Sequence, residues 1–261
     1  MRMSLCLAAM LAATMVMDTM SAQTLGAALT AQQHRVLSVD ARVSGRLVLV
    51  DGAGKRSSTK FLVKTHGFAD GVRLLEELET PQPLRILVRL EPSGRVTARL
   101  AHKDAAGKWQ TDSAPARLTD SLAGTGFTLE DLVDEQFFWK DQALVGRAPC
   151  GSRQCVTLKS VAGSADHSQY ASVVSSFDEK TNAVVHVVKT MRGSGVVKDV
   201  TLSNFHVSHG VTAAAQIELK IAGAAGSSLF VIDRGTAKAN LTRADFDLGS
   251  ATLEEPKDED Y

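Results

Sequence analysis

The chain has 261 residues, with 29 Lys and Arg against 29 Asp and Glu, so its formal net charge at pH 7 is zero. Nucleic-acid binders and polybasic membrane-surface proteins usually carry a basic excess, and the even balance argues against both classes. With 44% hydrophobic and 22% charged residues, the composition is that of an ordinary globular protein. All-β units of this length commonly form one domain, so we expect a single domain.

The first 22 residues have the pattern of a secretory signal peptide. Arg2 is followed by an apolar run, LCLAAMLAATMVM, that ends before Asp18. A membrane-spanning helix needs about 20 apolar residues, and this run is well short of that. Cleavage after Ala22 would release a soluble exported protein. An uncleaved N-terminal anchor is the alternative.

Two cysteines follow the signal peptide, Cys150 and Cys155. In an oxidising compartment an even number of close cysteines suggests a disulfide, and this pair can close a small loop around Gly151. Across so short a loop the disulfide would stabilise the folded protein by about 2 kcal/mol, and its effect would be local. A thiol redox motif would have two intervening residues and a zinc site would need two more ligands, so both alternatives are weaker.

Most of the remaining sequence alternates between apolar and polar residues, and β-branched residues crowd the apolar positions. This pattern predicts a mainly β protein of about eleven strands, paired antiparallel with their neighbours through short turns. The expected strands are 36–50, 59–65, 84–90, 95–102, 143–148, 155–161, 169–177, 183–191, 196–206, 212–222 and 227–233.

Three segments favour helix. Residues 23–37 are rich in Ala, and residues 129–139 follow Thr128, a residue suited to be an N-cap, with acidic residues in the first turn. Residues 243–248 form a final helical turn after Thr242. We therefore expect one domain over residues 23–250, followed by a charged flexible tail over residues 251–261.

A single long curved sheet cannot bury its concave face alone. Helices, side chains or a ligand must occupy that face. This requirement is the first indication of function.

Catalytic and metal-binding motifs are weak. His206 and His209 are three apart on or after a strand, where they would point to opposite faces, and His186 is expected at the surface. The sequence has no Gly-x-Ser-x-Gly elbow, and the segment after Gly52 lacks the spacing of a phosphate-binding loop. We therefore expect no enzyme activity and no metal site.

The stretch from Ala116 to Leu132 carries an ordered set of residues: Arg117, Ser121, Gly124, Phe127, Glu130, Asp131 and Leu132. This set resembles the signature of the LolA-like outer-membrane lipoprotein-sorting family, in which such a segment leads into a short helix. Gly126 replaces the acidic residue of that signature, and Leu129 replaces its aromatic residue. From about Val36 to Leu248 the order of elements also agrees.

The resemblance implies a half-barrel of about eleven strands, closed by helices around a hydrophobic cavity for acyl chains. It also implies no cofactor and no catalytic residues. Alternation on the predicted strands suggests five residues that would line the cavity: Val48, Phe61, Leu87, Val173 and Val185. The alternative is that these residues pack a closed core with no room for a ligand.

The sequence therefore predicts a periplasmic carrier of lipids or lipoproteins that shelters acyl chains, each buried CH₂ contributing about 0.8 kcal/mol. Its partners would be those acyl chains, an inner-membrane transporter and an outer-membrane acceptor, and not nucleic acid. One alternative is a lipid-responsive regulator of the same fold that binds a membrane partner. An exported hydrolase is a weaker alternative, since its catalytic constellation is missing.

Overall fold

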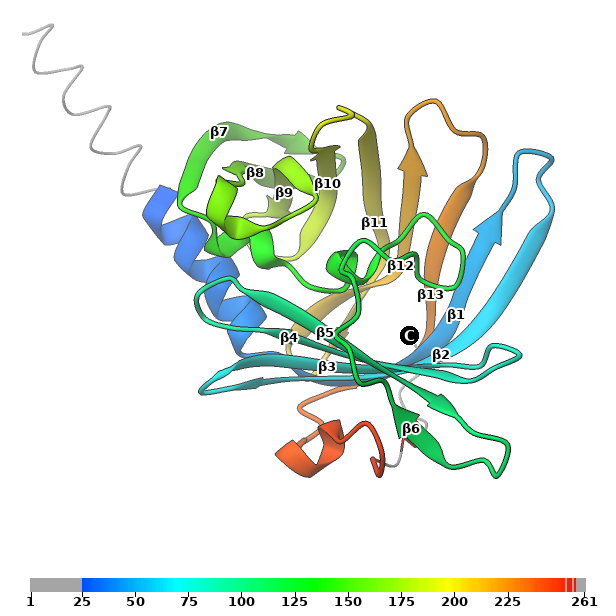
Figure 1. The fold of residues 1–261 in the computed structure, drawn as a ribbon. Coiled ribbons are helices and arrows are strands. Elements are labelled where there is room, and N and C mark those ends of the chain that lie inside the picture. The colour runs from blue at the N-terminus through cyan, green and yellow to red at the C-terminus, as the bar shows by residue number, and fades with distance from the viewer. Residues whose placement is uncertain (1–24, 252, 255, 257–261) are drawn as a thin grey trace, which may run out of the picture.

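The chain folds into one curved, open antiparallel sheet of thirteen strands (Figure 1). The computed structural model describes residues 25–251, 253–254 and 256, so the expected signal peptide and most of the expected tail lie outside the described residues. The sheet wraps around residues 112–140, and a helix over residues 25–37 is hydrogen-bonded to Phe137 and Asn182. This arrangement is the half-barrel that the sequence predicted.

The bounds of the strands are β1 (Asp40–Val50), β2 (Arg56–Phe68), β3 (Gly71–Leu78), β4 (Leu84–Leu90), β5 (Val96–Lys103), β6 (Trp109–Thr111), β7 (Asp141–Cys150), β8 (Arg153–Val161), β9 (Tyr170–Asp178), β10 (Val184–Met191), β11 (Val197–Ser208), β12 (Val211–Ile221) and β13 (Ser227–Ala237). Four short 3₁₀ turns complete the fold: η1 (Leu129–Leu132), η2 (Glu135–Phe138), η3 (Ser164–Asp166) and η4 (Arg243–Phe246).

The order of strands across the sheet is β6-β5-β4-β3-β2-β1-β13-β12-β11-β10-β9-β8-β7. The first and last strands of the chain, β1 and β13, pair at the centre, while β6 and β7 form the two edges. Residues 112–140, which we call the covering segment, therefore run from one edge to the other across the open side of the sheet. A segment that must cross the open side is well placed to cover the concave face.

Side chains of the sheet are buried on both faces. The concave face packs against the helix and the covering segment in a large apolar core. A smaller core on the convex face joins Leu75 of β3 and Ala101 of β5 to Phe246 and Leu248, which follow β13. Strands β3 to β5 are thus covered on both sides.

Two strands of the structure are missing from the sequence prediction, β3 and β6, so the expected count of eleven is two too low. In β3 the residues Leu74-Leu75-Glu76-Glu77-Leu78 do not alternate, because Leu74 and Leu75 are buried on opposite faces. A strand that is covered on both sides has no reason to alternate.

The predicted helices are partly confirmed. A helix spans residues 25–37, and the first strand begins at Asp40, not at Val36. The helix expected over residues 129–139 is instead two 3₁₀ turns, η1 and η2, separated by the extended Val133.

Candidate functional site

The concave face is lined by apolar side chains from nearly every strand. On β1 to β4 these include Leu47, Phe61, Val63, Val72, Leu74, Leu78, Ile86, Val88 and Leu90, and on β8 to β12 they include Val156, Leu158, Val173, Phe177, Val187, Val200 and Leu219. All are buried. Leu122, Phe127, Leu129, Val133 and Phe137 of the covering segment pack against this face, together with Val36 of the helix.

Phe127 connects the tip of the covering segment to the centre of the sheet. Its ring lies 4.8 Å from that of Phe230 on β13, which in turn lies 5.3 Å from the ring of Phe61 on β2. Both pairs are close to edge-to-face, the geometry that aromatic quadrupoles favour. In this structure the covering segment fills the concave face with its own side chains.

Gly126, beside Phe127, approaches the sheet more closely than another residue could. A Cβ at this position would lie 2.8 Å from Cδ2 of Leu219 and 3.2 Å from Cδ1 of Ile221. The Gly126 N–H donates to Oγ of Ser228, with a distance of 2.9 Å. A side chain here, such as the acidic residue of the LolA-like signature, would therefore require Leu219 and Ile221 to shift.

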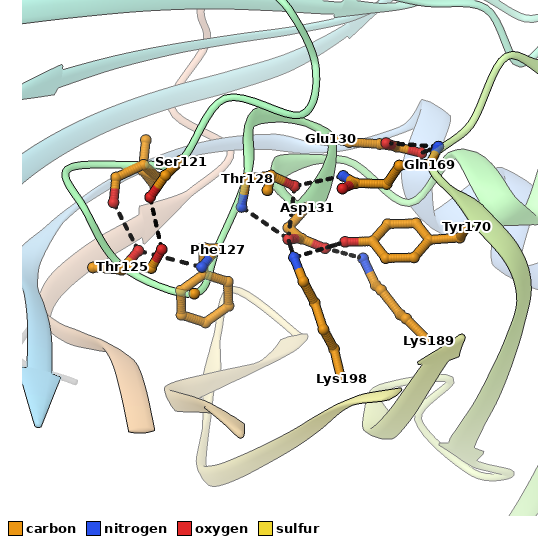
Figure 2. Close-up of polar contacts among 12 residues, drawn as sticks. Ser121, Thr125, Phe127, Thr128, Glu130, Asp131, Gln169, Tyr170, Lys189 and Lys198 are labelled. Carbon is orange, nitrogen blue, oxygen red and sulfur yellow. Dashed lines mark hydrogen bonds and ion pairs between the residues drawn. The ribbon is translucent and has the colours of Figure 1, made fainter. Parts of the chain in front are cut away.

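The turn before Phe127 is held by local hydrogen bonds. Oγ of Ser121 donates to the carbonyl of Thr125 at 2.7 Å, and a β-bridge joins Ser121 to Thr128 (Figure 2). Gly124 takes a φ of +76°, which glycine tolerates best. Arg117, by contrast, has a side chain that is 81% exposed and pairs with nearby Asp120. These motif residues shape the turn.

Asp131 of η1 anchors the covering segment to β9, β10 and β11 (Figure 2). Its carboxylate lies 2.7 Å from Nζ of Lys189 and 2.9 Å from Nζ of Lys198, and it accepts a 2.6 Å hydrogen bond from the hydroxyl of Tyr170. It also accepts the backbone N–H of Thr128, closing a capping box. Burial alone would raise the pKa of Asp131, but the two ammonium groups hold that pKa well below its usual range.

Glu130 and Glu135, on either side of Asp131, are buried, and Asp134 is half-buried. Glu130 accepts hydrogen bonds from the Ser168 hydroxyl and from the Gln169 N–H. Burial, and to a smaller extent the neighbouring Glu130, raises the pKa of Glu135 to about 9. Arg35 of the helix bonds Asp134 at 2.6 Å. Thus the motif residues Glu130 and Asp131, together with Asp134 of the covering segment, are polar anchors of that segment, while Leu132 packs against the apolar core.

The five residues expected to line the cavity are not all on the concave face. Phe61 and Val173 are buried there, and their contact with a ligand stays a prediction. Val48 lies on the opposite face from the buried Leu47, and Leu87 packs into the convex core. Val185 falls at a bulge between Val184 and His186 and belongs to neither core.

These three placements have physical causes. Val48 lies within the apolar run Leu47-Val48-Leu49-Val50, where alternation cannot assign a face. Leu87 is on a strand that is buried on both faces, and the bulge at Val185 shifts the alternation by one residue. Leu47, Ile86 and Val187 are the concave-face residues of these strands.

The remaining predicted positions are at the surface or at an edge of the sheet. Cys150 and Cys155 are joined by a disulfide, with Cα atoms 5.8 Å apart, at the β7–β8 hairpin. His186 bonds Asp199 at 3.0 Å with both side chains partly exposed. Over the described residues, no group of three or more His, Cys, Asp and Glu side chains is arranged to hold a metal ion.

A depression of about 400 Å³ opens where β12 and β13 separate. The two strands pair only from Gln216 with Val231 to Leu219 with Ser228. Beyond that point the depression is lined by Asn204, Phe205, His206, Ala215, Gln216, Val231, Ile232 and Asp233. Of these residues the sequence analysis singled out His206 alone, and only as a weak metal-binding candidate.

The comparisons with known proteins agree with this fold. A protein-family model whose description reads "-like: Uncharacterized protein" matches residues 105–250, more than half of the chain, including the covering segment. The chain belongs to that family. No curated protein sequence matches it.

Solved structures resemble the chain over nearly its whole length. A DUF1329 family protein from Desulfovibrio piger has a TM-score of 0.71 at 14% identity, covering 85% of this chain and 97% of its own. A putative outer membrane lipoprotein-sorting protein domain from Vibrio parahaemolyticus has 0.70 at 16%, covering 83% and 94%. A LolA superfamily protein from Nitrosomonas europaea has 0.58 at 12%, covering 85% and 97%. At these identities the likeness shows a shared fold, the LolA-like half-barrel.

In the described part of the chain, no helix is long and apolar enough to cross a membrane.

Proposed function

We propose that this protein is a periplasmic carrier that shelters acyl chains of lipids or lipoproteins between the concave face and the covering segment. The observation that carries the proposal is the packing of the Phe127 ring against Phe230, which in turn packs against Phe61 on the apolar concave face. Another apolar group can replace the Phe127 ring on this face, because few polar contacts are lost when the ring leaves. The resemblance to lipoprotein-sorting proteins in fold supports the same class of ligand.

The two parts of the covering segment are held by different kinds of contact, as this role requires. Its C-terminal part is fixed by buried ion pairs of Asp131 and by the bond between Arg35 and Asp134. Its tip, residues 121–127, meets the sheet through the apolar side chains of Leu122 and Phe127 and through one hydrogen bond from Gly126. We expect the tip to swing away while Asp131 stays in place, so that a chain enters where Phe127 now lies.

The energetics of this exchange favour a long chain. Each CH₂ that leaves water contributes about 0.8 kcal/mol, so ten or so methylenes outweigh the contacts of one phenylalanine ring. No charge is needed in such a site, which agrees with the even balance of charged residues. Signal-directed export through residues 1–22 would bring the protein to its cargo, with an inner-membrane transporter as donor and an outer-membrane protein as acceptor.

The direct test is mass spectrometry of lipid extracted from gently purified protein, together with binding of a fluorescent fatty acid. A Phe61→Glu substitution places a charge on the concave face and should abolish binding. The matched control is Val48→Glu, which places the same charge on the convex face and should bind normally. Because Phe61→Glu adds a buried charge, Phe61→Ala serves as the second variant, and circular dichroism checks the fold of each.

The proposal is wrong if no lipid copurifies and the wild-type protein takes up no fatty acid. A stable one-to-one complex with a single membrane protein, without exchange of ligand, would favour the regulator on the same fold instead.

A further inference from the structure

Glu76 is a carboxyl group in the middle of the apolar concave face. It lies on β3 between Leu74 and Leu78, and it faces Val63 of β2 and Ile86 of β4 in the register of the sheet. All four neighbours belong to the concave core and are buried. No ordinary requirement of the fold calls for a polar residue at this position.

Glu76 is also without a hydrogen-bond partner. Its residue is 0% exposed, and both carboxyl oxygens are buried and unbonded. Among the described residues no other carboxyl group has both oxygens in this state. Burial raises the pKa of Glu76 to about 8, so the group is mostly protonated at neutral pH.

The neighbouring Glu77 lies on the other face of the strand, and there its carboxylate has a charged partner. Oε2 of Glu77 lies 2.9 Å from Nε of Arg85 on the convex side. Glu76 cannot reach Arg85, since side chains alternate between the faces of a strand. A buried polar group with no partner costs stability, and such a cost is usually retained for a functional reason.

We infer that Glu76 is the polar contact that selects the ligand, by hydrogen bonding to a hydroxyl or carbonyl oxygen carried within the ligand's apolar body. The inference rests on the proposed carrier function and names the class of lipid. A protonated carboxyl offers one O–H donor and one C=O acceptor. A lipid with an internal oxygen satisfies at least one of them, whereas a plain hydrocarbon chain leaves both unsatisfied.

The discrimination follows from the hydrogen bond. A net hydrogen bond of about 0.5–1.5 kcal/mol corresponds to a preference of up to about tenfold for the oxygen-bearing ligand. Ligand length and shape contribute equally to both lipids, so a matched pair that differs by one oxygen isolates the contribution of Glu76.

The test uses the full mature chain and competition against a bound fluorescent fatty acid. The competitors are stearic acid, its mid-chain hydroxylated analogue and its mid-chain keto analogue. Wild-type protein should prefer the two oxygen-bearing acids by up to about tenfold. Glu76→Leu should remove this preference, and Glu76→Gln, whose amide both donates and accepts, should keep it. Glu79→Leu, the same change at an exposed position on the turn after β3, is the control and should also keep it.

The outcomes separate the inference from the function on which it rests. If stearic acid and its analogues bind the wild-type protein equally, or if Glu76→Leu keeps the preference, the inference is wrong and the carrier function stands. If none of the three acids binds the wild-type protein, both are wrong. Folding does not confuse the result, since Glu76→Leu replaces an unbonded polar group by an apolar one of similar size.

Discussion

Oδ2 of Asp131 lies 2.9 Å from Nζ of Lys198, and each side chain is only 3% exposed. Lys189 completes the arrangement on the other oxygen at 2.7 Å. One carboxylate thus balances two buried ammonium groups that come from neighbouring strands, β10 and β11. Such a cluster adds little net stability over an apolar core, but it is costly to break, since a lost partner leaves the other charges buried alone.

Replacing Asp131 by Asn should therefore destabilise the protein strongly. The change keeps the shape of the side chain but leaves Lys189 and Lys198 without their counter-ion. We expect a loss of about 3–5 kcal/mol in the free energy of unfolding, measured by urea denaturation. Asp233→Asn is the matched control, because its pair with Arg46 is half exposed and should be worth less than about 1 kcal/mol. Equal losses in the two variants would contradict this account of the anchor.

The disulfide between Cys150 and Cys155 should act locally. It closes the short β7–β8 hairpin at the edge of the sheet, far in sequence from the tip of the covering segment. Replacing both cysteines by serine should cost about 2 kcal/mol in stability. Fatty-acid binding by the folded variant should be unchanged, as measured by fluorescence titration. A large loss of fatty-acid binding in a folded variant would show that the disulfide shapes the binding site.

The sequence predicted the class of fold because alternation and β-branched residues are local signals that most strands of this sheet carry. The prediction failed at positions where apolar and polar residues do not alternate, so that the pattern cannot assign a strand or a face. Val48 and Leu87 lie in apolar runs, and β3 is buried on both faces, so period two vanishes there. The sequence placed the motif residues Glu130 and Asp131 in the first turn of a short helix, and the resemblance marked them as motif residues.

The partners of those motif residues were missed because they are distant in sequence. Lys189 and Lys198 bond Asp131 across 58 and 67 positions of the chain. One local signal could have pointed to them. In β10, Lys189 stands two positions after the inward-facing Val187, where the pattern calls for an apolar residue. A charged residue at such a position indicates a buried partner. The same reasoning applied to Glu76 would have needed β3 to be recognised as a strand.

A side chain at position 126 should weaken the fit of the covering segment on the sheet. Gly126→Asp would bring a Cβ within 2.8 Å of Cδ2 of Leu219, and because Leu219 is buried we expect the tip of the covering segment to move away from the sheet. We expect a loss of about 1–3 kcal/mol in stability, together with faster uptake of a fluorescent fatty acid, measured by stopped flow. Gly26→Asp is the control, because a Cβ there meets nothing within 4 Å. Unchanged stability and uptake in Gly126→Asp would argue against a close fit of the tip.

Glu76 should make stability fall as pH rises. Its pKa is about 8 in the folded protein against a usual value of 4.5, so between these values the folded state holds a proton that the unfolded state has released. The free energy of unfolding therefore decreases with rising pH across this window, by at most roughly 1.4 kcal/mol per pH unit, and levels off above the folded pKa.

Glu76→Gln removes this contribution and keeps the shape of the side chain. Urea denaturation at about pH 5.5 and about pH 8.5 should show a decrease that is larger by a few kcal/mol in the wild-type protein than in Glu76→Gln. Glu135, whose pKa is also raised, contributes in the same direction to both proteins and cancels in the comparison. An equal decrease in the two proteins would mean that Glu76 is already ionised in the folded state, which requires a positive or donating partner beside it.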